Sequence, residues 1–251
     1  MKPRSLRTHL FALVVATVLP LVLFGVAAVA WSAWAQTRAS ERDLQERAAA
    51  AALAVRREIG AGVAMLNGVA VTEMAAAGGP ALAGALRPLA EASGGWIMVF
   101  DAQGRLGAST LPGALPPTAD LARQPWIEAA WQLRESRVSD LHLGRAPGRE
   151  VVTVFVPALR DGQPVAVLAL TLPPERLAGL LAVQPLPGRT VAVLVDGAGR
   201  IVAASRDHAQ LLGTPAPAAL QGAKERDHGM IEGTALRGVA STLAFHRVAG
   251  T

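Results

Sequence analysis

An uninterrupted apolar segment near the N-terminus constrains this chain more than any other feature of its sequence. Leu10–Thr37 carries no ionisable side chain and follows a short basic tip, residues 1–9. A helix needs about 20 predominantly apolar residues to cross the hydrocarbon core of a bilayer, so this run is long enough. The positive-inside rule keeps the basic tip in the cytoplasm, while Trp31 and Trp34 suit the opposite interface. We therefore expect a single span in the inner (cytoplasmic) membrane, with the bulk of the chain in the periplasm.

A cleaved signal peptide is the alternative interpretation of the same segment. Ala33-Trp34-Ala35 is a small-x-small triplet of the kind that a signal peptidase prefers. The apolar run is about twice as long as the usual signal-peptide core, which favours a retained anchor. Both interpretations export the rest of the chain. The sequence contains no cysteine, so disulfides and thiolate metal sites are excluded.

The composition and the motifs exclude several classes of function. The net charge is +5, part of it lies in the basic tip, and the arginines are scattered with no tyrosine among them, which disfavours nucleic-acid binding. The five histidines show no metal-ligand spacing. No Walker loop, Gly-x-Ser-x-Gly motif or nucleophile–base arrangement occurs. We expect this chain to be no enzyme and to bind neither a cofactor nor a metal.

A long amphipathic helix is predicted directly behind the apolar run. Apolar residues recur at steps of three and four from Leu44 to Ala70, which is typical of one buried helix face. Charged pairs of alternating sign, Glu41–Arg42 and Glu46–Arg47, suit the solvated face. Because no strong breaker precedes Gly78, we expect the helix to continue to that residue.

Two similar hairpin signals indicate an internal repeat. Asp101–Arg105 and Asp196–Arg200 share the pattern Asp-x-x-Gly-Arg, and each follows a buried-strand signal. The Asp side chain opens such a turn and the Gly supplies a positive φ. A duplicated domain explains both copies, and a chance match of two generic turns is the alternative.

The expected fold class is α+β, with a transmembrane helix, a long amphipathic helix and two antiparallel-sheet units. The predicted divisions are a cytoplasmic tip at 1–9, a transmembrane helix at 10–36, a stalk helix at 37–78, a membrane-distal unit at 79–185 and a membrane-proximal unit at 186–251. Strands of the first unit are expected at 96–100, 106–109, 138–143, 150–159 and 165–172, and its helices at 80–92, 121–134 and 173–183. The second unit is shorter, with strands expected at 190–195, 201–205, 230–232 and 242–248. We expect the protein to continue beyond Thr251 with a further strand and a second membrane span.

This order of elements resembles the double Cache sensor domain, the extracytoplasmic input of bacterial sensor histidine kinases, chemoreceptors and diguanylate cyclases. Arg123-Gln-Pro-Trp126-Ile-Glu-Ala-Ala130 resembles the Arg-x-x-Trp helix of the family, and residues 151–170 resemble its central hairpin. Leu211-Leu212-Gly213 resembles its membrane-proximal module. The resemblance covers residues 36–251. It implies PAS-like units, a homodimer and a small-molecule ligand.

The resemblance also implies the residues of a ligand site. In amino-acid-sensing members the Arg and Trp of that helix hold a carboxylate, which Arg123 and Trp126 match. His142 and Gly144 stand where those members carry the Tyr and Asp that hold the ammonium group. A small anion such as a carboxylate is the expected ligand. The expected site residues are Arg123, Trp126, Trp131, His142 and Thr153. The alternative is that the two tryptophans belong to the core and that Arg123 lies at the surface.

These features predict a membrane-anchored sensor that passes its signal along the N-terminal helix. A histidine kinase or cyclase output domain would lie outside this chain. Two alternatives remain open from the sequence: a non-catalytic envelope assembly protein, and a secreted solute-binding protein if the chain is cleaved after Ala35.

Overall fold

The computed structural model contains two compact units, Met1–Glu46 and Arg47–Thr251. The structure describes residues 6–73, 75, 78–111, 125–144, 148–223, 225–234 and 236–248. The first unit is helical, and the second holds the sheets. The α+β class, with a long N-terminal helix and antiparallel sheets, is thereby confirmed.

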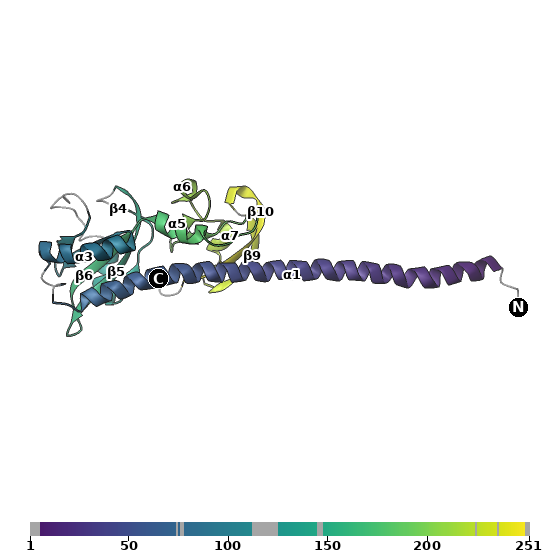
Figure 1. The fold of residues 1–251 in the computed structure, drawn as a ribbon, viewed down its shortest axis with the longest axis horizontal. Helices are drawn as coiled ribbons and strands as arrows, with labels where there is room; N and C mark the ends of the chain where they lie inside the picture. The colour runs from purple at the N-terminus through teal and green to yellow at the C-terminus, as the bar shows by residue number, and fades with distance from the viewer. Residues whose placement is uncertain are drawn as a thin grey trace. The chain divides into compact units, whose positions relative to one another are not determined.

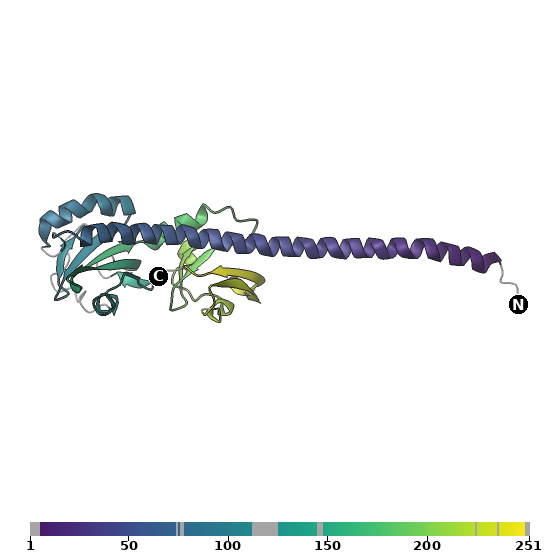
Figure 2. The same ribbon diagram turned by 90° about the horizontal axis from the view of Figure 1, so that it is seen from below.

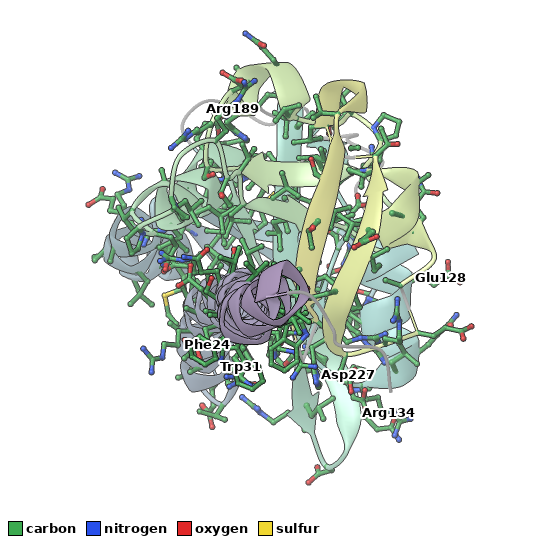
Figure 3. All side chains as sticks on the ribbon, turned by 90° about the vertical axis from the view of Figure 1, so that its right-hand side faces the viewer. Phe24, Trp31, Glu128, Arg134, Arg189 and Asp227 are labelled. Carbon is green, nitrogen blue, oxygen red and sulfur yellow. The ribbon has the colours of Figure 1, made fainter. Side chains whose placement is uncertain are left out.

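Helix α1 spans Leu6–Ala70, so the predicted apolar run and most of the predicted stalk form one helix (Figure 1). In the first unit its apolar side chains are exposed: Phe24 is 76% exposed and Trp31 is 70% exposed. Both project outward from the helix in Figure 3. Among the described residues, no helix combines the length and the apolar content that crossing a membrane requires. The transmembrane assignment of residues 10–36 therefore stays a prediction.

In the second unit α1 buries the apolar stripe that its periodicity predicts. Val55 is 1% exposed and Leu66 is fully buried, and both belong to the main hydrophobic core. The opposite side of the helix carries the exposed charges Arg56 and Arg57. Burial of one face at this spacing is what holds a long helix against a sheet.

A tertiary contact determines where α1 ends. The guanidinium of Arg160 donates to the carbonyl oxygens of Ala70 at 3.1 Å and Thr72 at 2.6 Å. The Thr72 hydroxyl donates to the carbonyl oxygen of Val69 at 2.7 Å. These donors satisfy carbonyl groups that the last turn of a helix leaves without intrahelical partners. The helix therefore stops at Ala70, short of the predicted end at residue 78.

A six-stranded antiparallel sheet, here called the large sheet, forms the centre of the second unit (Figure 2). Its strand order is β2-β1-β6-β5-β3, and β4 also pairs with β5. The strands are β1 (Trp96–Asp101), β2 (Leu106–Ser109), β3 (Arg137–Val138), β4 (His142–Gly144), β5 (Arg149–Arg160) and β6 (Gln163–Leu172). The single strand predicted at 138–143 is wrong, because residues 139–141 leave the sheet between β3 and β4.

Each face of the large sheet is covered by different helices. Helix α1 and α3 (Gly79–Ser93) cover one face, and the aliphatic side chains of α5 (Pro174–Ala182) join the same core. Helix α4 (Pro125–Leu133) packs on the other face, where Ala130 is fully buried. Side chains of β1, β5 and β6 alternate between the two cores, as the twofold period of a strand requires.

The C-terminal segment, residues 186–251, contains two separate hairpins. Strands β7 (Val193–Val195) and β8 (Ile201–Ala204) form one, and β9 (His228–Thr234) and β10 (Ala240–His246) form the other. The short helical elements between them are α6 (His208–Leu211), α7 (Ala218–Gln221) and the 3-10 turn η2 (Leu236–Gly238). Strand β7 is shorter than the predicted 190–195, and all four strands lie where the sequence places them.

Candidate functional site

Three polar side chains meet in register on the α4 face of the large sheet. Trp96 on β1 pairs with Thr171 on β6, which pairs with Thr153 on β5. Both threonines are buried, and their hydroxyl oxygens lie 3.2 Å apart. The neighbours of these residues on the same face are apolar, and they include Phe100 and Phe155. We call Trp96, Thr153 and Thr171 the polar row.

Trp96 is the one member of the polar row whose side-chain polar atom has no hydrogen-bond partner among the described residues. Trp96 is 7% exposed, and its buried Nε1 has no hydrogen-bond partner in the structure. Leaving a buried donor unpaired costs about 1–3 kcal/mol, and such groups call for an explanation such as a bound molecule. The N–H group is therefore available to an acceptor that reaches this face.

A positive charge lies beside the polar row. The guanidinium carbon of Arg149 lies 5.6 Å from the centroid of the Trp96 ring. Arg149 is exposed and makes no ion pair within the part of the chain that the structure describes. On this face β1, β5 and β6 contribute no carboxylate, because their acidic residues Asp101 and Glu150 alternate with the residues that face α4. Indole, hydroxyl and guanidinium donors together suit an anion or a carbonyl oxygen.

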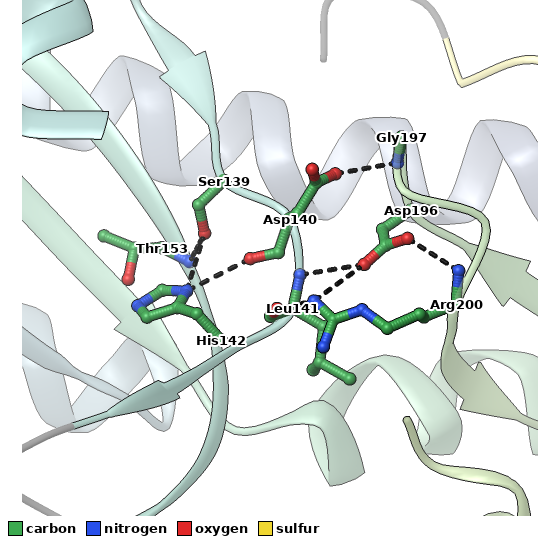
Figure 4. A network of polar contacts seen from close by, with 8 residues as sticks. All are labelled: Ser139, Asp140, Leu141, His142, Thr153, Asp196, Gly197 and Arg200. Atoms are coloured by element: carbon green, nitrogen blue, oxygen red, sulfur yellow. Dashed lines mark hydrogen bonds and ion pairs between the residues drawn. The ribbon is translucent and has the colours of Figure 1, made fainter. Parts of the chain in front are cut away.

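His142 contacts Ser139, which is hydrogen-bonded to Thr153 of the polar row. The backbones of Ser139 and Thr153 are joined by a hydrogen bond from the Ser139 N–H to the Thr153 carbonyl at 2.8 Å. The Thr153 N–H donates to the Ser139 hydroxyl at 2.9 Å, and that hydroxyl lies 3.2 Å from Nδ1 of His142 (Figure 4). The same Nδ1 lies 3.1 Å from the Asp140 carbonyl oxygen. The interruption between β3 and β4 thus brings an imidazole to the edge of the polar row.

The next residues of this interruption contact the β7–β8 turn of the C-terminal segment (Figure 4). The Leu141 N–H donates to Oδ2 of Asp196 at 3.1 Å, and the Arg200 guanidinium donates to the Leu141 carbonyl oxygen. The Gly197 N–H donates to Oδ1 of Asp140 at 2.7 Å. Leu141 is 1% exposed and belongs to the main core. We call Ser139–His142 the linking segment.

The two Asp-x-x-Gly-Arg turns have the same local structure. In each turn the Asp accepts at Oδ1 from the Arg N–H, at 2.9 Å for Asp101 and 2.7 Å for Asp196. In each, the Gly N–H donates to the Asp carbonyl, at 2.8 and 3.0 Å. Gly104 and Gly199 both have a positive φ, as predicted.

The surroundings of the two turns differ. Oδ2 of Asp101 binds Nε of Arg105 within its own turn, and the Arg105 side chain is 74% exposed. The Asp196 side chain is only 3% exposed, and its Oδ2 binds the linking segment as well as Arg200. Burial raises the pKa of Asp101, but hydrogen bonds from Arg105 and Gln103 outweigh it and hold the pKa below its usual value.

Of the five predicted site residues, the structure describes some in full and others in part or not at all. Arg123 lies outside the described residues. Trp126 lies in α4, but its side chain is outside what the structure describes. Trp131 is half-buried and packs against the apolar cluster on the α4 face. His142 and Thr153 are brought together through Ser139, as described above.

Sequence reasoning missed Trp96, Arg149 and Thr171. Strand alternation could have placed Arg149 on the same face as Thr153, since both lie on β5. For Trp96 on β1 and Thr171 on β6, alternation does not tell which face is shared with Thr153. Their register across the sheet is a long-range property that alternation alone does not supply.

Comparisons with known proteins identify the fold. None of the family models and none of the curated proteins compared with the chain matches it. Among solved structures, the extracellular domain of the histidine kinase rpHK1S-Z16 has a TM-score of 0.72 at 19% identity, covering 87% of this chain and 92% of that one. The ligand-binding domain of the Pseudomonas aeruginosa amino acid chemoreceptor PctB, in complex with L-Arg, has a TM-score of 0.67 at 21% identity, covering 84% and 89%. That of the Pseudomonas fluorescens chemoreceptor CtaA, in complex with L-isoleucine, has a TM-score of 0.65 at 18% identity, covering 86% and 89%.

The CtaA and PctB structures are ligand-binding domains, and the rpHK1S-Z16 structure is an extracellular domain. At such low identity the likeness concerns the fold. The chain has the Cache-type fold, shared with the ligand-binding domains of these chemoreceptors and the extracellular domain of rpHK1S-Z16.

Proposed function

We propose that this chain is the extracytoplasmic input region of a membrane-bound signalling receptor and that it binds a small anion, such as a carboxylate, on the α4 face of the large sheet. The single observation that carries the proposal is the unused indole N–H of Trp96, buried beside two threonine hydroxyls and the Arg149 guanidinium. The solved relatives in fold bind amino acids, all of which contain a carboxylate.

The absence of an acidic side chain on this face of β1, β5 and β6 favours a ligand without an ammonium group. An ammonium group in such a place would lack the charge-assisted hydrogen bond that a carboxylate supplies, worth about 1.5–3 kcal/mol. Arg123 and Trp126, which the resemblance assigns to the carboxylate, belong to the same proposed site. Trp131, His142 and Thr153 complete the set predicted from the sequence.

The membrane part of the proposal rests on the first unit. Its helix exposes a row of large apolar side chains, which water disfavours and a bilayer accepts. The ring centroids of Trp31 and Trp34 lie 5.4 Å apart. The guanidinium carbon of Arg38 lies 3.7 Å from the centroid of the Trp34 ring. An aromatic pair with a cation beside it suits the interface between lipid and water. In this proposal α1 carries the signal from the large sheet to the membrane, in a homodimer.

A thermal-shift screen tests the binding proposal. Acetate, lactate and succinate are the probes, and their neutral methyl esters are the controls. A binding carboxylate stabilises the folded protein by about 2.7 kcal/mol at 100 times its Kd. We expect Arg123→Ala, Arg149→Met and Thr153→Val to reduce this stabilisation. The exposed Arg189 lies in the C-terminal segment, so Arg189→Met serves as the matched control.

Stabilisation by the esters as well as the acids would contradict an anion site. Retention of the full effect in both arginine variants would place the site elsewhere. The location is tested separately with a C-terminal reporter fusion, where activity confined to the cytoplasm would rule out an exported sensor.

A further inference from the structure

The linking segment is hydrogen-bonded at one end to the polar row and at the other to the C-terminal segment. These contacts lead from the buried Thr153, through Ser139 and the backbone of the linking segment, to the β7–β8 turn. Figure 4 shows that the linking segment lies between the two, with Thr153 on one side and Asp196 on the other. The bonds from Ser139 to Thr153, from Leu141 to Asp196 and from Gly197 to Asp140 are 2.7–3.1 Å long.

Leu141 is held more firmly than an ordinary loop residue. Its N–H donates to Asp196 and its carbonyl accepts from Arg200, so one residue pair satisfies both polar groups of its peptide backbone. Asp196 and Arg200 are themselves joined, with Nη2 of Arg200 3.3 Å from Oδ2 of Asp196. Because the Asp196 side chain is 3% exposed, water competes little for these bonds.

The contacts of Asp196 and Arg200 with Leu141 are additional to the hydrogen bonds that form the turn itself. The Asp101–Arg105 turn has the same internal hydrogen bonds, so local stability does not require a partner outside the turn. Only the second copy directs its Asp and Arg onto a different part of the chain. The additional contacts therefore call for an explanation beyond turn formation.

We propose that Asp196 and Arg200 are positioning residues for the candidate ligand site, acting through Leu141 on Ser139 and His142. As a role in ligand binding, this assignment rests on the proposed function. Any displacement of Thr153 or His142 by a ligand is then passed to the β7–β8 hairpin. If ligand binding shifts the equilibrium between two states of that hairpin by some factor, the two hairpin states differ in ligand affinity by the same factor. This gives the sensor a route between its sheet and the C-terminal segment in addition to α1.

Amide hydrogen exchange tests the coupling without any ligand. The test variant is Arg200→Met, which removes the donor to Leu141. The matched control is Arg105→Met, the equivalent position in the other turn, where the Arg105 side chain bonds Asp101 and Gln103 and no other described residue. We expect Arg200→Met to accelerate exchange at the Ser139 and Thr153 amides by about tenfold, since losing a charge-assisted hydrogen bond favours local opening.

Amides of β6, such as Leu170, report on global unfolding and should keep their wild-type rates. The reciprocal variant is Ser139→Ala, which should accelerate exchange at the Leu141 and Gly197 amides. Should Arg200→Met fail to fold, Asp140→Ala tests the same link, since it removes only the acceptor of the Gly197 N–H. Faster exchange in residues 196–201 with unchanged rates at Ser139 and Thr153 would overturn the proposal. So would an equal effect of Arg105→Met.

The exchange experiment and the thermal-shift screen for carboxylates give results that can be told apart. If a carboxylate stabilises the protein but exchange shows no coupling, the positioning role fails and the ligand site stands. If exchange shows coupling but no carboxylate binds, the positioning role for a ligand site is lost along with the proposed anion site. If both hold, Arg200→Met should raise the Kd of the bound carboxylate, and Arg105→Met should leave it unchanged.

Discussion

Nε of Arg176 lies 2.5 Å from Oε1 of Glu58, an ion pair that joins α5 to α1 across 118 positions of the chain. The two side chains are 36% and 22% exposed, so the pair is neither buried nor fully solvated. It lies beside the main core, to which both helices contribute aliphatic side chains. The pair thus fixes α5, which precedes the C-terminal segment, to the helix that leads toward the N-terminus.

A double-mutant cycle of Glu58→Gln and Arg176→Gln should reveal modest coupling. We expect an interaction free energy of about 0.5–1 kcal/mol, because solvent screens a partly exposed pair. Urea unfolding of the four proteins measures it. The coupling should shrink in 1 M salt, where the screening length falls to about 3 Å. A coupling energy that does not depend on salt would show that the pair acts by packing.

Substitution of Arg160 should loosen the end of α1. Arg160→Met leaves the carbonyls of Ala70 and Thr72 without their guanidinium donor, at an expected cost of about 1.5–3 kcal/mol. Hydrogen exchange should rise in the last turn of α1 and remain unchanged at Val55. Arg137→Met is the control, because Arg137 pairs with Glu135 at the surface. Equal destabilisation by both variants would contradict the capping role of Arg160.

Gly95 and Gly84 should respond to alanine in opposite directions. A Cβ at Gly95 would lie 2.2 Å from the Thr171 carbonyl oxygen, so Gly95→Ala must displace the β1–β6 pairing next to the polar row. We expect a loss of about 3 kcal/mol or more. Gly84 is exposed in α3 with nothing near its Cβ position, and Gly84→Ala should add about 0.5–1 kcal/mol. Chemical denaturation compares the two, and a mild effect at Gly95 would refute the close approach.

The hydrogen bonds of the ionised Asp101 carboxylate should stabilise the folded protein at neutral pH and should be lost in acid. Hydrogen bonds hold the pKa of this carboxyl in the folded protein below its usual value, so the folded state favours the ionised form. This stability is present above the unfolded pKa of about 3.9 and is lost as the pH falls through the lower folded pKa. Asp101→Asn should therefore lose less stability than the wild type between about pH 5 and pH 2. An NMR titration that places the pKa of Asp101 above its usual value would contradict this.

Local bonding explains which elements the sequence predicts correctly. The buried stripe of α1 follows from apolar side chains three and four residues apart, and the two turns follow from an Asp that bonds the N–H groups of its own turn. The strands at 96–100, 150–159 and 165–172 are predominantly apolar runs. Such patterns depend on residues close together in the chain. The Cache-type fold that the solved structures share was implied by the resemblance to that family.

Contacts between distant residues decided the rest. At the end of α1 the Thr72 hydroxyl is a local donor, but the guanidinium comes from Arg160 at the turn of the β5–β6 hairpin. That contact spans about 90 positions of the chain, so the sequence near Ala70 does not predict it. The strand predicted at 138–143 is broken because Asp196 and Arg200 hold the backbone of Leu141 outside the sheet. The unused N–H of Trp96 likewise appears only when three strands are aligned. The sequence by itself determined most of the elements, since helix and strand patterns depend on residues close together in the chain. Only the tertiary structure decided the site, since its donors come together through sheet register and packing.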